Sequence, residues 1–267
     1  MRFYLGTHVP AWLSRERGWP KREAQFAGVP LFVSARRLRD QQRWRKALAP
    51  WALDSGGFTE LSMYGKWTVT PAQYVADVYR WSEMIGVPEF CAPQDWMCEP
   101  VMVEKTGKSV RDHQELTIAN YLELKRLAPD LPFIPVLQGW HYDDYMRHVE
   151  DYARSGVRLA ALPTVGVGSV CRRQDTGMAE ELMRDLHGLG IKTHGFGFKL
   201  KGLERAARWM SSADSMAWSM QARRGAPLPV CSHRNCANCA LYALNWREKA
   251  LRAARRGDRV KTQPTLF

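Results

Sequence analysis

The sequence predicts an α/β fold, a (β/α)8 (TIM) barrel followed by a metal-binding segment and a C-terminal helix. Short apolar runs alternate with longer amphipathic runs, as in βαβ units that build a parallel sheet. The 267 residues are close to the roughly 250 that such a barrel needs. After the eighth apolar run, three cysteines fall within nine residues. We therefore expect a barrel over residues 1–225 and a segment over 226–267 that packs on it.

The expected elements follow from local pattern. Eight strands are expected over residues 3–7, 31–34, 51–54, 89–93, 133–138, 159–163, 193–198 and 213–217. Helical periodicity covers residues 71–84, 111–127, 142–155, 177–189, 202–210 and 240–256. Thr70 and Pro71 are typical of an N-cap followed by a first-turn proline.

Composition narrows the class of protein. A hydrophobic fraction of 45% with 25% charged residues excludes collagen-like, coiled-coil and wholly disordered chains. The net charge of +12 favours a polyanionic partner. No run approaches the ~18 apolar residues of a membrane span, and the first residues lack a signal peptide's apolar core. We expect a cytoplasmic protein that does not contact membranes.

Polar residues gather where the expected strands end. They are Asp54, which precedes Ser55-Gly56-Gly57-Phe58, then Asp95, Gln138, Gly166-Val167-Gly168 and Asp214. Singly, each could be a turn former or a helix cap. In a barrel, however, the carboxyl ends of all strands meet at one mouth, where active sites lie. Together they indicate a site for a planar, hydrogen-bonding molecule.

The cysteine cluster has the spacing of a metal site. Cys231, His233, Cys236 and Cys239 read C-x-H-x2-C-x2-C. Three thiolates and one imidazole complete a tetrahedral zinc site with no position left for water, so the expected Zn²⁺ is structural. The alternative is three unrelated buried cysteines. No fingerprint for ATP, nicotinamide or flavin is found.

Arginines form the third feature. Candidate nucleic-acid-binding residues are Arg172, Arg173, Arg223, Arg224, Arg252, Arg255, Arg256 and Arg259. The last four recur on one face of the terminal helix. An ordinary solvated surface is the alternative, but the net charge supports a phosphate-binding track.

These motifs resemble a known family. Asp54-Ser55-Gly56-Gly57-Phe58 is similar to the Asp-Ser-Gly-Gly-aromatic motif of queuine/archaeosine tRNA-guanine transglycosylases, which are zinc-containing (β/α)8 barrels. The other polar residues and the cysteines follow in the same order. The runs 3–8, 168–173 and 231–246 resemble the DpdA branch, the deazapurine DNA modification proteins of bacteria and bacteriophages.

The resemblance implies a role for each candidate. Asp214 would be the nucleophile that attacks C1′ of the sugar, and Asp54 would contact the base edge and transfer protons. Asp95 and Gln138 would hydrogen-bond the purine face. The run Gly166-Val167-Gly168 would let backbone approach the base, and Phe58 would stack on it.

The chain departs from the tRNA enzymes in three ways. No histidine follows His233, so this residue must supply the fourth zinc ligand. The Ser-Met-Ala-Trp-Ser run after Asp214 differs from theirs, and the shorter chain shows no separate RNA-binding domain.

The sequence therefore predicts a glycosyltransferase that exchanges guanine in DNA for a 7-deazaguanine, such as 7-cyano-7-deazaguanine, through a covalent Asp–deoxyribose intermediate. Two alternatives stay open: a tRNA-guanine transglycosylase, and a zinc-stabilised nucleic-acid-binding subunit without catalysis. The expected partners are DNA and the free 7-deazaguanine base, in a bacterial or phage-infected cell. A homodimer and partner proteins of the pathway are left open.

Overall fold

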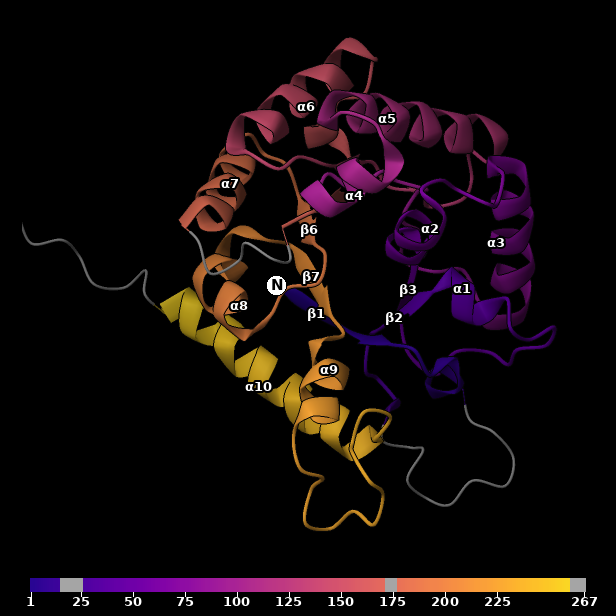
Figure 1. The fold of residues 1–267 in the computed structure, drawn as a ribbon, viewed down its shortest axis with the longest axis vertical. Helices are drawn as coiled ribbons and strands as arrows, with labels where there is room; N and C mark the ends of the chain where they lie inside the picture. Colours follow the sequence, from indigo (N-terminus) through magenta and orange to yellow (C-terminus); the bar gives the residue numbers. More distant parts are fainter. Residues whose placement is uncertain (15–25, 171–176, 260–267) are drawn as a thin grey trace, which may run out of the picture.

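The computed structural model describes residues 1–14, 26–170 and 177–259. Its centre is a seven-stranded parallel sheet in the order β3-β2-β1-β7-β6-β5-β4, which curls into part of a barrel with helices around its outside (Figure 1). The strands are Arg2–Thr7 (β1), Leu31–Ser34 (β2), Trp51–Asp54 (β3), Val136–Leu137 (β4), Val165–Val167 (β5), Thr193–Gly195 (β6) and Ser212–Ser215 (β7). The predicted α/β class and parallel sheet are confirmed.

The helices are Ala35–Leu38 (α1), Gly57–Tyr64 (α2), Pro71–Ile85 (α3), Pro100–Thr106 (α4), Val110–Leu127 (α5), Tyr142–Arg154 (α6), Gly177–Gly188 (α7), Leu200–Ala206 (α8), Ala217–Arg224 (α9) and Ala240–Arg259 (α10). Short 3-10 helices cover Pro10–Leu13, Leu159–Ala161 and Ala207–Trp209. The start of α3 is fixed as its sequence predicts, because Thr70 and Gln73 form a capping box. The expected helix over 202–210 divides into α8 and a 3-10 turn.

The complete eight-stranded barrel is not confirmed, since the sheet of the described residues has seven strands. Where a strand was expected over 89–93, Cys91 forms isolated bridges to Leu53 and Phe133. These bridges join the β3 side of the sheet to the chain leading into β4. Prolines at 88, 93, 132 and 135 surround them and cannot donate ladder hydrogen bonds. This segment therefore links the two edges without extending into a regular strand.

The sixth expected strand was placed wrongly. Residues 159–163 begin with a 3-10 helix, and β5 lies a few residues later. The run Gly166-Val167-Gly168, which was expected after the end of a strand, therefore lies largely within β5. β-branched Val165 and Val167 favour extended backbone. Gly166 between them is required by packing, since a Cβ there would lie 2.5 Å from the Phe196 ring.

The sheet is apolar on both faces. Its outer face packs on the surrounding helices and includes Leu5, Val33 and Leu53, which share a core with Trp81 of α3. Its inner face carries the aromatic cluster, formed by Tyr4, Phe32, Ala52, Phe90, Ile134 and Phe196. Alternation along each strand produces the two faces, and burial on both sides is typical of parallel sheets.

The C-terminal helix α10 packs against α8, α9 and β1, as Figure 1 shows. Trp246 of α10 lies against Phe3, with 6.2 Å between ring centroids. Gly257 allows close approach, because a Cβ there would lie 2.5 Å from the Glu204 carbonyl oxygen. Among the described helices, none has the length and apolar character to cross a bilayer.

Candidate active site and metal centre

A pocket of about 490 Å³ opens at the carboxyl ends of β1, β2, β3 and β7. Ligand pockets fall in this size range. Asp54 ends β3 and Asp214 lies in β7, so two carboxylates distant in sequence share one pocket. The other lining residues are Gly6, Thr7, His8, Phe32, Ser34, Arg36, Arg37, Asp40, Gly56, Phe58, Thr59 and Met216.

Asp54 is held in an environment that favours its neutral form. Burial, with a smaller contribution from the nearby Asp214 charge, raises the pKa of Asp54 to about 6. Hydrogen bonds from the Ser34 side chain and the Gly56 backbone oppose this rise. Gly56 has a φ of 86°, in the left-handed region that glycine adopts without strain. This turn places its amide against the carboxylate and starts α2.

Asp214 is buried at 6% exposure and is fixed through one oxygen. The Gly197 amide donates to Oδ1 over 3.0 Å. The imidazole Nε2 of His194 lies 3.4 Å from the same atom. A carboxylate held in this way has a defined orientation beside the pocket, which is what a nucleophile or charge-stabilising group requires.

Asp95 and Gln138 belong to a buried polar network next to Asp54. Gln138 Nε2 donates to Asp95 Oδ2, and the Ser169 hydroxyl lies 2.7 Å from Gln138 Oε1 and 2.8 Å from Glu99 Oε2. Burial, with the charges of Asp54 and Glu99, raises the pKa of Asp95 to about 7, although the Gln138 hydrogen bond opposes this. Ser169 has a φ of 57°, a conformation that non-glycine residues rarely adopt and that is common at functional sites.

The remaining predicted base-binding residues divide into two groups. Phe58 lines the pocket and is 52% exposed, so its ring is available for stacking. Within the described part of the chain, Gly166, Val167 and Gly168 are not among the pocket's lining residues. Val167 is buried in the main core, and a Cβ on Gly168 would overlap the Gln138 amide. These residues shape the site by packing.

A second hollow, about 360 Å³ in volume, continues from the pocket. His8, Arg37 and Met216 line both. Lys199 and Arg223 add further positive charge. We call this continuation the cationic groove. Its charge suits a phosphate backbone running past the pocket.

The other predicted arginines are placed differently. Arg172 and Arg173 lie outside the described residues. Arg224 is exposed beside Arg223 but is not among the described lining of either hollow. The same holds for Arg252, Arg255 and Arg256 on α10, where Arg256 pairs with Glu204 at 2.9 Å. For Arg259 the structure gives only its place at the end of α10.

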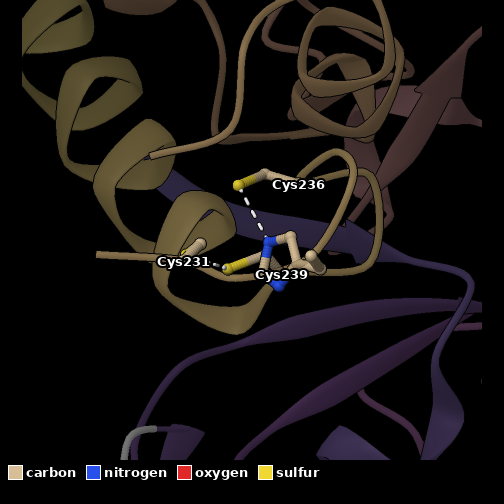
Figure 2. A group of neighbouring side chains, drawn as sticks. Cys231, Cys236 and Cys239 are labelled. Atoms are coloured by element: carbon tan, nitrogen blue, oxygen red, sulfur yellow. Dashed lines mark hydrogen bonds between the residues drawn. The ribbon is translucent and has the colours of Figure 1, made fainter. Parts of the chain in front are cut away.

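The cysteine cluster folds into a candidate metal centre. Ligand atoms of Cys231, His233, Cys236 and Cys239 all lie within 4.8 Å of one another. Figure 2 shows the three cysteine side chains converging. The sulfurs of Cys231 and Cys239 are 3.8 Å apart, and zinc–sulfur bonds of about 2.3 Å in a tetrahedron require roughly the same spacing. The Leu228 amide also donates to the Cys236 sulfur over 3.3 Å. These residues could hold a metal ion, and soft donors of this kind suit zinc.

The metal-binding loop touches the pocket. His8 Nε2 donates to Asn238 Oδ1 over 2.5 Å, and the His8 ring stacks on Trp218 with centroids 5.7 Å apart. The Ser219 hydroxyl donates to the Ala237 carbonyl over 2.9 Å. The loop thereby supports the wall that His8 contributes to both hollows.

Sequence reasoning missed several residues of the site. Arg36 and Arg37 lie two and three residues after the end of β2, and His8 directly follows β1, so the strand-end rule that found Asp54 could have found them. His194 gave no such signal, because it lies within a strand and is completely buried. Only its long-range contact with Asp214 reveals its place.

The fold and site thus define an α/β protein with a carboxylate pocket, a cationic groove and a Cys/His metal centre. Residues 1–265 match the model of the family described as DpdA, DeoxyPurine in DNA protein A. The chain therefore belongs to this family, as its motifs predict. A search of curated proteins found no match for it. Family membership supports the role of a DNA-modifying enzyme in deazapurine modification, with DNA as its substrate.

Proposed function

We propose that this protein is a DNA-guanine transglycosylase, which replaces guanine in DNA with a 7-deazaguanine. The observation that carries the proposal is the sharing of one pocket by Asp54 and Asp214. Asp54 has a pKa raised to about 6 by burial, whereas Asp214 is anchored by the Gly197 amide. Two carboxylates in different environments can divide acid–base and nucleophilic work between them.

In the first half-reaction, a carboxylate oxygen of Asp214 forms a bond to C1′ as the C1′–N9 bond breaks. The departing guanine takes the electron pair of that bond and accepts a proton from Asp54. A pKa of about 6 leaves a useful fraction of Asp54 protonated near neutral pH. The covalent intermediate divides one difficult displacement into two easier steps.

The second half-reaction reverses the first with a different base. The incoming 7-deazaguanine gives its N9 proton to Asp54, N9 attacks C1′, and the Asp214 carboxylate leaves. Over the two half-reactions one C1′–N9 bond is broken and another C1′–N9 bond is formed, so no ATP or redox cofactor is consumed.

Binding of the base and the polymer is assigned to neighbouring groups. Phe58 would stack on the base, and Asp95 with Gln138 would hydrogen-bond its polar edge, as the family resemblance implies. The cationic groove, with Arg37 and Arg223 on its walls, would carry the DNA backbone. Because a paired base cannot reach the pocket, the target nucleotide must be flipped out of a duplex at a cost of a few kcal/mol.

We infer that Zn²⁺ occupies the centre formed by Cys231, His233, Cys236 and Cys239. Four protein donors leave no place for substrate, so the ion would stabilise the loop that contacts His8. We propose that the protein acts in the cytoplasm, where its DNA substrate would be found.

The test is exchange of labelled guanine out of a DNA duplex in the presence of 7-cyano-7-deazaguanine, with tRNA in a parallel reaction. Asp214→Ala should abolish release of label while the fold and metal content persist. Asp130→Asn removes an exposed carboxylate that accepts a hydrogen bond from the Tyr79 hydroxyl and lines neither hollow, so this variant should exchange guanine normally. Normal exchange by Asp214→Ala would refute the mechanism, and release from tRNA alone would move the chain to the tRNA alternative.

A further inference from the structure

His194 is a buried ionisable side chain to which the mechanism above gives no role. It is completely buried on β6 and is enclosed by the aromatic cluster. Its ring centroid lies 4.7 Å from that of Phe90, 4.9 Å from Phe196, 5.6 Å from Phe32 and 5.8 Å from Tyr4. Packing alone would be served by another aromatic ring. A buried imidazole also carries two nitrogens that need polar partners.

One ring nitrogen is accounted for. His194 Nδ1 lies 2.8 Å from the hydroxyl of Ser212, itself buried on β7. Nε2 has no hydrogen-bond partner among the described residues, and Asp214 Oδ1 is 3.4 Å from it.

This arrangement selects a tautomer of the imidazole. If Nδ1 carried the proton, the lone pair of Nε2 would face an anionic oxygen at 3.4 Å, which is repulsive. If the Ser212 hydroxyl donates to Nδ1, the proton resides on Nε2 and is directed at the carboxylate. A serine hydroxyl can either donate a hydrogen bond to Nδ1 or accept one from it, so Ser212 is compatible with both tautomers. The negative charge of the Asp214 carboxylate therefore decides between them, and it favours the tautomer with the proton on Nε2.

Two donors therefore converge on a single oxygen of Asp214. The Gly197 amide is bonded to Oδ1 at 3.0 Å, and the His194 Nε2–H group approaches the same atom. Catalytic hydrogen bonds are often long without substrate and shorten in the reacting complex. Oδ2 is the oxygen that these contacts leave to the substrate.

We propose that His194 is a positioning residue that holds Oδ1 of Asp214, so that Oδ2 is the atom that bonds to C1′. This inference rests on the proposed function. In the first half-reaction, Oδ2 supplies the electron pair of the new C1′–O bond, and the C1′–N9 pair leaves with the protonated guanine. In the second, N9 of the incoming base supplies the pair, and the C1′–Oδ2 pair returns to the carboxylate.

A hydrogen bond to Oδ1 has opposite effects on the two halves. It lowers the basicity of the carboxylate, which weakens it slightly as a nucleophile and improves it as a leaving group. Loss of the donor should therefore slow breakdown of the intermediate and slightly speed its formation. A side chain that only filled space would not change the two steps in opposite directions.

The experiment measures the lifetime of the covalent DNA–protein adduct on denaturing gels, after a chase with 7-cyano-7-deazaguanine. His194→Phe keeps an aromatic ring but removes the donor, and we expect the adduct to persist roughly tenfold longer or more, the size expected for one hydrogen bond to a charged group. His194→Gln, whose amide can place an N–H near the Nε2 position, should restore a lifetime close to that of the unmodified chain. His187→Gln, on the exposed side of α7, is the control and should leave the lifetime unchanged.

Melting curves and metal content establish that each variant is folded. If His194→Phe fails to fold, Ser212→Ala takes its place, because loss of the partner of Nδ1 should weaken the Nε2–H tautomer and lengthen the lifetime less strongly. Equal lifetimes for His194→Phe and the unmodified chain would overturn the proposal, as would a His194→Gln variant that behaves like His194→Phe.

An independent arm does not require activity. Nitrogen-15 NMR of labelled imidazoles should show His194 protonated at Nε2 and unprotonated at Nδ1 at neutral pH, and the opposite tautomer would refute the inference. Absence of any adduct from the unmodified chain, with the expected tautomer present, would instead reject the covalent mechanism of the proposed function.

Discussion

Replacement of Asp54 by asparagine should stabilise the folded protein while it abolishes base exchange. The carboxyl is disfavoured as an anion because it is largely withdrawn from water and lies near Asp214. Asparagine has nearly the same shape and carries no charge. Its side-chain oxygen can still accept a hydrogen bond from Ser34 or from the Gly56 amide.

The magnitude follows from the shift in pKa. Ionisation of Asp54 moves from an ordinary value of 3.8 to about 6 in the folded state. A raised folded-state pKa means that the folded protein is most favoured below the unfolded value and loses stability as pH rises through the folded one. At about 1.36 kcal/mol per unit, the cost is about 3 kcal/mol at pH 8 and about 1.6 kcal/mol at pH 5. Asp54→Asn should remove this cost.

The assay is urea unfolding of both proteins at a series of pH values from 5 to 8. The free energy of unfolding of Asp54→Asn should exceed that of the unmodified chain by a margin that grows with pH. Guanine release by the variant should be lost over the same range, because no group remains to protonate the leaving base. A margin that is absent, reversed or independent of pH would refute the assignment of a buried, partly protonated Asp54.

Three further predictions concern the metal, the packing of the site and the groove. Cys236→Ser should lower the amount of bound zinc, measured by mass spectrometry of the native protein, and should also lower the melting temperature. Full metal occupancy in this variant would contradict the proposed ligand set. Gly168→Ala should cost about 1–3 kcal/mol of stability through overpacking against Gln138 and weaken binding of the free base, measured by calorimetry. Gly188→Ala, where a Cβ would meet nothing within 4 Å, should cause neither loss. Arg223→Ala should weaken DNA binding and reduce the slope of log affinity against log salt by about 0.9, the value for one phosphate contact; an unchanged slope would remove Arg223 from the DNA path.

The sequence predicts strand positions well where each strand is a self-contained apolar run. The expected bounds of β2 and β3 agree with the structure, since a proline directly precedes each strand and each strand ends at a polar residue. The prediction fails near 89–93 and 159–163. Proline limits pairing at the first, and at the second the alanine-rich run forms a 3-10 turn while the following valines take the strand. Tertiary pairing, which a single sequence does not reveal, decides both cases.

The metal ligands and the two pocket carboxylates could be predicted because each carries a local signal. The cysteines are closely spaced, Asp54 ends its strand, and Asp214 lies one residue before the end of its strand. Contacts such as that of His8 with Asn238 depend on elements from opposite ends of the chain. No local pattern encodes them, so the residues involved were missed.

The place of β1 in the sheet affects how the protein can be made in the cell. Leu5 pairs with Leu31 on one side and with Ser215 on the other, so one edge of β1 stays unpaired while the intervening chain is synthesised. An unpaired edge strand is prone to join other chains, and contacts so distant in sequence form slowly. The strand that closes this edge also carries Asp214. A nascent chain therefore has no complete pocket until the ribosome has passed β7, and a truncated product would combine an open edge with an incomplete pocket.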